Sequence, residues 1–234
     1  MKEILGKLIL EDGSVFEGFS FGFEKLVSGE VVFNTGMVGY PETLTDPSYC
    51  GQIIVMTYPL IGNYGVPQQE FENGLSSVFE SDRIYASGLI VSSYSENHSH
   101  WNADQSLSSW LVENKIPALY GIDTRELTKK LRDKGTMRGK IIFEQEGVED
   151  ITDKSLVEQV SVKEPIIYPA GKKSILLVDC GVKNSIIHAF LRRNITVLRV
   201  PYNYDFLSEK TNGIILSNGP GDPKDCMETI ENTK

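Results

Sequence analysis

The chain has 234 residues, of which 40% are hydrophobic and 24% charged, proportions that are typical of a globular protein with a hydrophobic core. Its formal net charge is -9, from 32 acidic and 23 basic residues. This acidic balance argues against nucleic-acid binding, which needs clustered Lys and Arg. The densest basic stretch, residues 125–138, is interleaved with acidic residues, and we interpret it as a solvated helix face rather than a nucleic-acid patch.

The cysteines Cys50, Cys180 and Cys226 are widely spaced and form no C-x-x-C pair. With only three histidines in the chain, this pattern predicts no metal site and favours a reducing compartment. Charged residues interrupt the segment 1–10, which therefore lacks the apolar stretch of a signal peptide. No apolar run approaches the roughly 18 residues that span a bilayer. We predict a cytoplasmic protein without membrane contact.

The first part of the chain predicts strands in quick succession. Segments 7–10 and 15–18 flank Asp12-Gly13, a pair that suits a hairpin turn. Three further segments are rich in Val, Ile and aromatic residues and predict strands, over 29–34, 52–58 and 84–91.

Two helices follow these strands. In segment 107–115 the apolar residues are spaced to share one face of a short helix. In the next helix Asp123 is the predicted N-cap, Glu126 completes a capping-box-like pair, and Gly135 ends the helix. Strands followed by helices predict an α+β N-terminal domain over residues 1–145.

Residues 146–172 are predicted to form an acidic, proline-containing linker with one short helix. In residues 173–234 the pattern changes to that of a parallel sheet, so the fold class overall is α/β. The apolar run 174–179 predicts a strand that is buried on both faces, and it precedes a helix over 183–193 and strands over 195–200 and 213–216. Three strands are few for an open sheet, so this domain is interpreted as an incomplete βαβ portion. The alternative is a complete three-stranded lobe.

The loop Ser217–Pro223 is the strongest candidate for a functional segment. Its two glycines follow a parallel strand, at the sheet edge where open α/β proteins bind ligands. Backbone N–H groups held by such a loop can receive an oxyanion. The alternative is a tight turn in which Asp222 caps the next helix. A phosphate-binding P-loop is excluded, because Asp222-Pro223 stands where the P-loop requires Lys and Ser or Thr.

Cys180 is not predicted to be a nucleophile. No motif places a histidine beside it, although His188 lies on the following helix. A buried cysteine at the end of a strand is the common case. Cys50 and Cys226 are interpreted in the same way.

The stretch 29–65 is unusually dense in Gly, Pro, Asn, Thr and Tyr, and its pattern fits either a structural role or a ligand-binding surface. The residues themselves resemble the N-terminal domain of the small, glutamine-hydrolysing subunit of carbamoyl-phosphate synthetase. GEVVFNT, TDPSY, TYPLIGNYG, GIDTRELT and LSNGPGDP are similar to that family's motifs and stand in that family's order. The resemblance covers about residues 8–226.

The resemblance implies that residues 173–234 begin a flavodoxin-like, class I glutamine amidotransferase domain. In this family a cysteine thiolate, assisted by a His–Glu pair, attacks the side-chain amide of glutamine. The ammonia then passes to a large subunit, which uses ATP and Mg²⁺ to make carbamoyl phosphate for arginine and pyrimidine biosynthesis. The implied partners are therefore L-glutamine and the large subunit in a heterodimer, with no cofactor in this chain.

Three residues match glutamine-binding positions of the family. Ser48, in the first domain, would reach across to the substrate, and Gly219 and Gly221 would contact glutamine through their backbone. The Gly219 N–H would help to hold the oxyanion.

The family's nucleophile lies in a Gly-x-Cys-x-Gly elbow, and the 234 residues contain no such motif. The resemblance therefore implies no catalytic residue in this chain, which we expect to be inactive by itself as an N-terminal fragment. The alternative is a natural short form that acts as a non-catalytic docking module for a synthetase large subunit. Another class I amidotransferase, such as one serving anthranilate synthesis, would explain the Gly-Pro-Gly loop but not the first domain.

Overall fold

The computed structural model describes residues 3–143, 155–206 and 209–233, and these form two compact units. Unit 1 comprises Met1–Thr45, Gly51–Gln69 and Arg83–Thr152, and unit 2 comprises Asp46–Cys50, Glu70–Asp82 and Asp153–Lys234. Two short segments from the middle of the predicted first domain therefore belong to unit 2, and we call them the exchanged segments: Asp46–Cys50 and Glu70–Asp82. The sequence pattern did not predict that they would leave the first domain.

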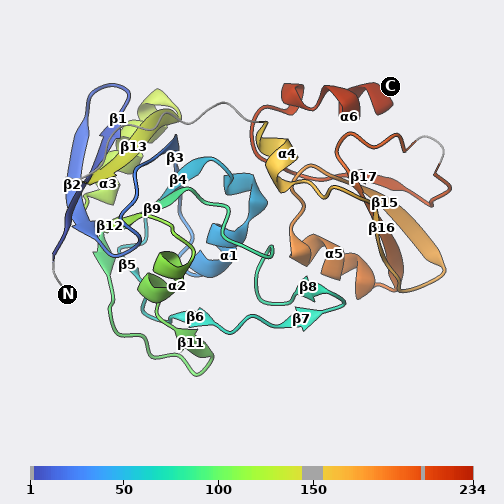
Figure 1. The fold of residues 1–234 in the computed structure, drawn as a ribbon, viewed down its shortest axis with the longest axis horizontal. Helices are drawn as coiled ribbons and strands as arrows, with labels where there is room; N and C mark the ends of the chain where they lie inside the picture. The colour runs from blue at the N-terminus through green and yellow to red at the C-terminus, as the bar shows by residue number, and fades with distance from the viewer. Residues whose placement is uncertain (1–2, 144–154, 207–208, 234) are drawn as a thin grey trace. The chain divides into compact units, whose positions relative to one another are not determined.

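Seven strands of unit 1 form a closed barrel (Figure 1). Their order around the barrel is β1 (Leu5–Leu10), β13 (Met137–Phe143), β3 (Val27–Asn34), β4 (Gln52–Met56), β9 (Gly88–Ile90), β12 (Ala118–Tyr120) and β2 (Val15–Ser20). The pairs β3–β4, β4–β9 and β9–β12 are parallel, and the other pairs are antiparallel. The predicted hairpin is confirmed as β1 and β2, with Gly13 in its turn at φ 84°.

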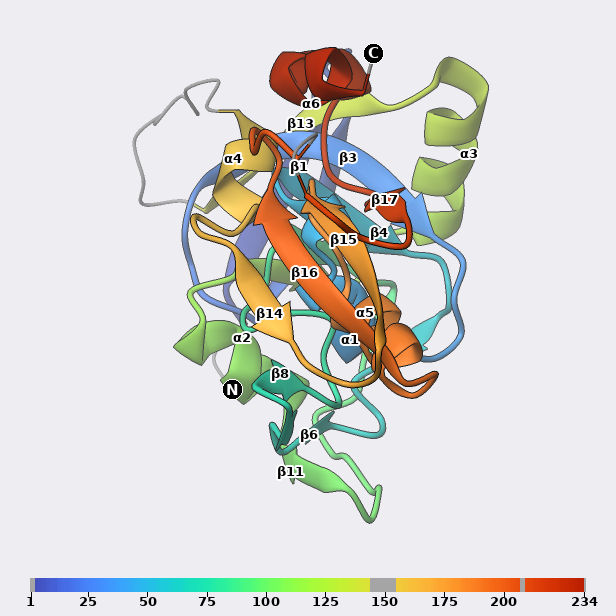
Figure 2. The same cartoon turned by 90° about the vertical axis from the view of Figure 1, so that its right-hand side faces the viewer.

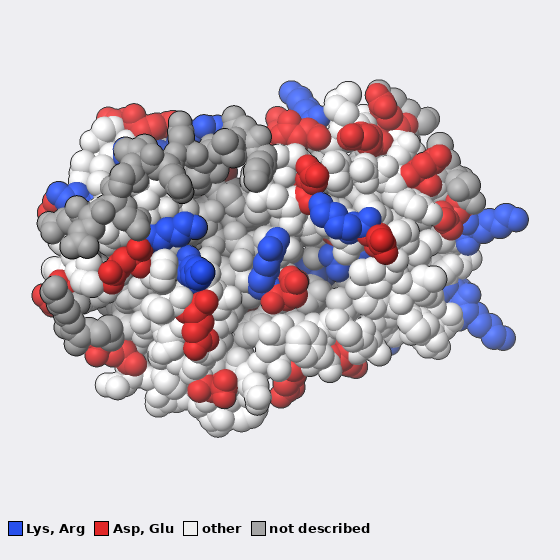
Figure 3. Space-filling model, viewed as in Figure 1, with Lys and Arg blue, Asp and Glu red and all other residues white. Residues whose placement is uncertain are grey.

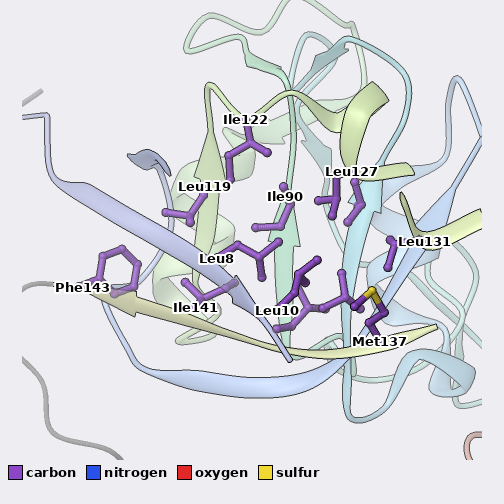
Figure 4. Close-up of a cluster of buried hydrophobic side chains, with 13 residues drawn as sticks. Leu8, Leu10, Ile90, Leu119, Ile122, Leu127, Leu131, Met137, Ile141 and Phe143 are labelled. Carbon is purple, nitrogen blue, oxygen red and sulfur yellow. The ribbon is translucent and has the colours of Figure 1, made fainter. Parts of the chain in front are cut away.

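A cluster of buried apolar side chains fills the barrel (Figure 4). Leu8 and Ile141 lie opposite each other in β1 and β13, and both are fully buried. Leu127 and Leu131 of α3 (Thr124–Lys134) belong to the same cluster, so the helix contributes its apolar face to the barrel core. The predicted apolar stripe of this helix is confirmed.

The ends of α3 also follow the prediction. The Asp123 carboxylate accepts a hydrogen bond from the Glu126 backbone N–H at 2.9 Å, and Gly135 follows the helix with φ 89°. A carboxylate at this position satisfies one of the N–H groups that the first turn leaves without an intrahelical partner.

Strand β13 was not predicted, because Arg138, Gly139 and Lys140 interrupt its apolar run. In the structure its residues alternate between the core and the surface, as the two-residue period of a strand requires. Gly139 faces Val31 so closely that an added Cβ would lie 2.6 Å from a Val31 methyl group. Gly139 interrupts the apolar pattern of the strand in the sequence, but close packing against Val31 requires a glycine at this position.

The remaining elements of unit 1 are short. The helix α2 (Leu107–Glu113) confirms the short helix predicted in this segment. The others are the helix α1 (Tyr40–Thr45) and the strand pairs β5 (Leu60–Ile61) with β10 (Ser93–Tyr94) and β6 (Val66–Pro67) with β11 (Ala103–Gln105).

Unit 2 contains a four-stranded sheet in the order β14 (Ile166–Tyr168), β16 (Ile195–Pro201), β15 (Lys173–Asp179), β17 (Ile214–Leu216) (Figure 2). The last three strands are parallel, and β14 pairs antiparallel with β16. If β15, β16 and β17 are numbered along the chain, their spatial order is 2-1-3, with which flavodoxin-like sheets begin. The predicted βαβ portion is present, with α5 (Asn184–Leu191) between β15 and β16.

Both faces of β15 are buried, as its continuous apolar sequence predicted. Leu176 and Val178 point to one face, where they pack with Val157 of α4 (Leu156–Val160). Leu177 points to the other face and packs with Ile187 of α5. Leu75 joins this second cluster from the hairpin β7 (Phe71–Glu72) and β8 (Leu75–Ser76), which lies in one of the exchanged segments.

The predicted linker lies partly outside the described residues, since 144–154 are not described. Its described part contains α4, which confirms the expected short helix, and the unexpected strand β14. Pro165 and Pro169 flank β14 and suggest a loop in the sequence, but an edge strand tolerates proline at its ends. The remaining elements of unit 2 are the 3-10 turns η1 (Pro47–Tyr49) and η2 (Pro223–Asp225) and the helix α6 (Met227–Asn232).

Candidate functional site

Two loops of unit 2 meet at the carboxyl ends of β15 and β17, the adjacent strands at which the chain order of the sheet reverses. Ligands of open α/β sheets bind at such a point. The Cys180 backbone N–H donates to Ser217 Oγ at 2.9 Å, and the Asn218 side chain lies 3.5 Å from the Gly181 carbonyl oxygen. Hydrogen bonds therefore join the loop that was predicted to be functional to the turn that follows β15.

Gly219 packs directly against the backbone of this turn. A Cβ at position 219 would lie 1.8 Å from the Cys180 carbonyl oxygen, so no other residue fits without a backbone shift. Gly221 has φ 79° and Gly181 has φ 124°, values that side chains other than that of glycine rarely allow. The two predicted glycines therefore hold a loop geometry that substitution would change.

Asp222 has the structural role that the alternative interpretation of this loop predicts. Its carboxylate accepts a hydrogen bond from the Lys224 backbone N–H at 2.9 Å and caps the turn η2.

The turn after β15 is held by the buried carboxylate of Asp179. Oδ1 accepts hydrogen bonds from the backbone N–H groups of Gly181 and Val182, both at 2.9 Å. Oδ2 accepts from the Val162 N–H at 2.9 Å and from Arg199, whose Nη2 lies 2.7 Å away. Burial by itself lowers the pKa of Arg199, but the charges and hydrogen bonds of Asp179 and Tyr168 together outweigh this effect, and the pKa is raised.

Ser48 lies in η1, in the exchanged segment Asp46–Cys50 of unit 2. Its Oγ accepts a hydrogen bond from Asn218 Nδ2 at 2.7 Å. Asn218 directly precedes Gly219, so the structure brings Ser48 to the same loop as Gly219 and Gly221. Ser48 and Asn218 lie 170 positions apart in the sequence, but the three residues that were predicted to bind a ligand all belong to one compact unit.

The Ser48 backbone is fixed by Asp46, a buried residue that is only 5% exposed. One oxygen of Asp46 accepts from the Ser48 N–H at 2.9 Å, and the other lies 2.5 Å from Lys183 Nζ. Burial lowers the pKa of Lys183, but the hydrogen bond and charge of Asp46 outweigh burial and raise it. Lys183 is therefore a cation at neutral pH and pairs with Asp46.

The three cysteines are buried, and none of them forms a disulfide. Burial raises the pKa of the Cys180 thiol to about 12, so its thiolate is scarce at neutral pH. His188 is engaged elsewhere, because its Nε2 is hydrogen-bonded to the Ser76 carbonyl oxygen at 3.0 Å and its Nδ1 lies 3.9 Å from the Glu72 carboxylate.

Most of the basic stretch 125–138 lies in the helix α3. Lys130 and Lys134 both pair with Asp12, at 2.9 and 3.0 Å. Hydrogen bonds from Ser14 and these two lysines lower the pKa of Asp12. On the face shown in Figure 3, Lys and Arg side chains are mixed with Asp and Glu.

Within the described ranges, no group of three or more His, Cys, Asp or Glu side chains is arranged to hold a metal ion. No helix among the described residues is long and apolar enough to cross a membrane.

Sequence reasoning missed four residues of this site: Asp46, Asp179, Lys183 and Asn218. Two of them stand inside motifs that had been identified, Asp46 in TDPSY and Asn218 in LSNGPGDP. Their partners, however, are distant in the sequence, so only the fold reveals what each one contacts.

Comparison with known proteins identifies the families that the two parts of the sequence match. A family model described as "Carbamoyl-phosphate synthase small chain, CPSase domain" matches residues 8–141, and one described as "Glutamine amidotransferase class-I" matches residues 176–234. These two matches confirm the predicted order of the domains' families along the chain.

Three curated relatives are similar over nearly the whole chain. The "Multifunctional protein CAD" of Squalus acanthias is 51% identical over 98% of this chain, and "Multifunctional protein pyr1-3" of Dictyostelium discoideum is 45% identical over 98%. "Carbamoyl-phosphate synthase [ammonia], mitochondrial" of Mus musculus is 46% identical over 97%. The chain spans only 11%, 11% and 16% of these relatives' lengths. By its sequence, the chain belongs to the carbamoyl-phosphate synthase small chain family.

Proposed function

We propose that this chain supplies part of the glutamine site of a glutamine-dependent carbamoyl-phosphate synthase. The observation that carries the proposal is the 2.7 Å hydrogen bond from Asn218 to Ser48, which brings Ser48 beside the Gly219–Gly221 loop. A hydroxyl group and the exposed backbone of a glycine loop are suited to a ligand with a carboxylate and an amide, such as L-glutamine.

In this proposal each of the three residues has a distinct task. Ser48 offers its hydroxyl to the ligand, and Gly221 lets the ligand approach the backbone. The Gly219 N–H stabilises the oxyanion that forms when a nucleophile attacks the side-chain amide. Loss of such a contact typically raises the barrier by about 3 kcal/mol.

The nucleophile itself is not among these 234 residues, which contain no Gly-x-Cys-x-Gly elbow. We therefore propose that the 234-residue chain binds glutamine weakly and does not hydrolyse it. Complete turnover would use ammonia in a large subunit or domain that binds ATP and Mg²⁺, as part of arginine and pyrimidine biosynthesis. We place the protein in the cytoplasm, a proposal that rests on its cysteines being thiols rather than disulfides and that imaging of the tagged protein would test.

Binding is tested by titrating the ¹⁵N-labelled chain with L-glutamine and following its amide resonances by NMR, a method that detects millimolar affinity. We expect the resonances of Ser48, Gly219 and Gly221 to shift in a saturable way. D-glutamine and L-asparagine serve as matched ligands and should produce smaller shifts. If the resonances at these three positions do not change with L-glutamine, the proposed site is wrong.

Hydrolysis is tested by measuring ammonia release from glutamine with the same chain. We expect none above the background of buffer alone. Ammonia release that disappears in a Cys180→Ala variant would contradict the proposal, since it would make the buried Cys180 a nucleophile.

A second candidate function is a non-catalytic docking module. The mouse relative is named for ammonia and not for glutamine. That name favours a non-catalytic role for the segment that matches this chain. Comparison of the intact mass with the encoded reading frame separates the two functions. A stop codon after Lys234 favours the docking module, and a frame that continues into a Gly-x-Cys-x-Gly elbow favours the glutamine site.

A further inference from the structure

The Asn218 side chain faces two oxygen atoms of unit 2. Its Nδ2 lies 2.7 Å from Ser48 Oγ and 3.5 Å from the Gly181 carbonyl oxygen. A carbonyl oxygen can only accept a hydrogen bond, so the NH₂ end of the amide is the end that belongs beside Gly181. The opposite orientation would place two carbonyl oxygens together without a hydrogen between them. Asn218 is therefore the donor to Ser48.

This assignment decides what the Ser48 hydroxyl can offer. A hydroxyl has one proton and two lone pairs, and here one lone pair accepts from Asn218. Within the part of the chain that the structure describes, the Ser48 hydroxyl donates to no other group. Its proton is consequently left for a ligand.

Both residues are anchored independently of each other. Asp46 fixes the Ser48 backbone N–H at 2.9 Å. On the other side, Ser217 Oγ donates to the Asn218 carbonyl oxygen at 2.7 Å and accepts from the Cys180 N–H at 2.9 Å. The hydrogen bond between Ser48 and Asn218 is therefore held from both ends, as a preorganised binding group requires.

We propose that Asn218 is a positioning residue that orients the Ser48 hydroxyl as a hydrogen-bond donor toward an oxygen acceptor of the ligand. The inference rests on the proposed glutamine site and deepens it. Carboxylate and amide carbonyl oxygens are such acceptors, and L-glutamine carries both. Asn218 acts through Ser48 and need not touch the ligand.

The first test needs no ligand. The side-chain NH₂ resonances of Asn218 are recorded by NMR in the unmodified chain and in Ser48→Ala and Ser48→Thr variants. We expect a clear shift in Ser48→Ala, which lacks the acceptor, and near-native resonances in Ser48→Thr, which keeps a hydroxyl. Unchanged Asn218 resonances in Ser48→Ala would overturn the hydrogen bond on which the inference depends.

The second test is a double-mutant cycle on L-glutamine affinity, measured by the NMR titration. Ser48→Ala and Asn218→Leu should each weaken binding by roughly tenfold, the size of one lost hydrogen bond. The double variant should bind no more weakly than Ser48→Ala alone, because Asn218 has nothing left to position. Asn203→Leu makes the same chemical change at an exposed residue of unit 2 and should leave affinity unchanged.

The outcomes are distinguishable. Additive losses in the double variant would show that Asn218 acts only on the loop, and the inference would be wrong while the glutamine site stood. Absence of any L-glutamine binding by the unmodified chain would overturn the proposed function, and with it the ligand part of the inference. Thermal unfolding of each variant checks that the fold is intact.

Discussion

The two units of this chain bury different kinds of residue. The barrel of unit 1 has one apolar core that its strands and α3 share. Unit 2 has a smaller apolar cluster on each side of its sheet, and it contains most of the buried polar residues. Of the buried polar residues that the structure describes, only Thr45 and Thr124 lie in unit 1.

This difference indicates which unit holds its side chains in specific positions through directional interactions. Apolar packing is non-directional, so the barrel tolerates exchange between side chains of similar volume. Buried polar groups require particular partners in particular positions. The hydrogen bonds of Asp46 and Asp179 therefore fix the loops of the candidate site more tightly than packing alone would do.

The largest effect is expected from Asp179→Ala. It leaves the buried Arg199 guanidinium without its carboxylate, which typically costs about 3–5 kcal/mol in the free energy of unfolding. Urea unfolding measures this loss, and Arg199→Met in the same chain should restore part of it. NMR should show displaced Gly181 and Val182 amide resonances.

Leu8→Ala is the matched change in the barrel, where Leu8 is fully buried. Its cost of about 2–5 kcal/mol is similar, but the resonances of the candidate site should not move. If Leu8→Ala displaces them as strongly as Asp179→Ala does, the contrast between the two units is wrong.

Gly219→Ala should lower the free energy of unfolding less than the two preceding variants do, but it should disrupt the candidate site completely. The added Cβ would overlap the Cys180 carbonyl oxygen, so the loop must shift at a cost of about 1–3 kcal/mol. L-glutamine binding should be lost. Gly213→Ala is the control, because its Cβ would meet no atom within 4 Å. Equal glutamine affinity in Gly219→Ala and the unmodified chain would refute the role of this close contact.

The smallest expected effect is the change with pH in the free energy of unfolding that the Cys180 thiol causes. Burial raises the pKa of Cys180 from 9.0 to about 12, so between these values the folded chain holds a proton that the unfolded chain has lost. This contribution to stability is fully present below pH 9 and falls as pH rises toward 12. Urea unfolding at a series of pH values should show a steeper decline for the unmodified chain than for Cys180→Ala. Parallel declines would mean that the thiol is not effectively buried.

Local elements with complete local signals were predictable. The Asp12-Gly13 hairpin, the Asp123-capped helix and the apolar strand over 174–179 each carry their cause within a few neighbouring residues. The same is true of the loop Ser217–Pro223, whose glycines and strand-end position marked it as a candidate site.

The strands β13 and β14 were not predictable, because their causes lie elsewhere in the chain. Gly139 breaks the apolar pattern of β13, yet it is required by the approach of Val31 from another strand. Pro165 and Pro169 suggest a loop, yet β14 pairs with β16 as an edge strand.

The sequence by itself determined the family, the α/β class and the three ligand-binding candidates Ser48, Gly219 and Gly221. Only the tertiary structure decided that Ser48 belongs to the compact unit of the Gly-Pro-Gly loop and that Asn218 donates to it. The physical reason is that a hydrogen bond depends on distance and direction in space. The 170 positions between Ser48 and Asn218 carry no local signal of either.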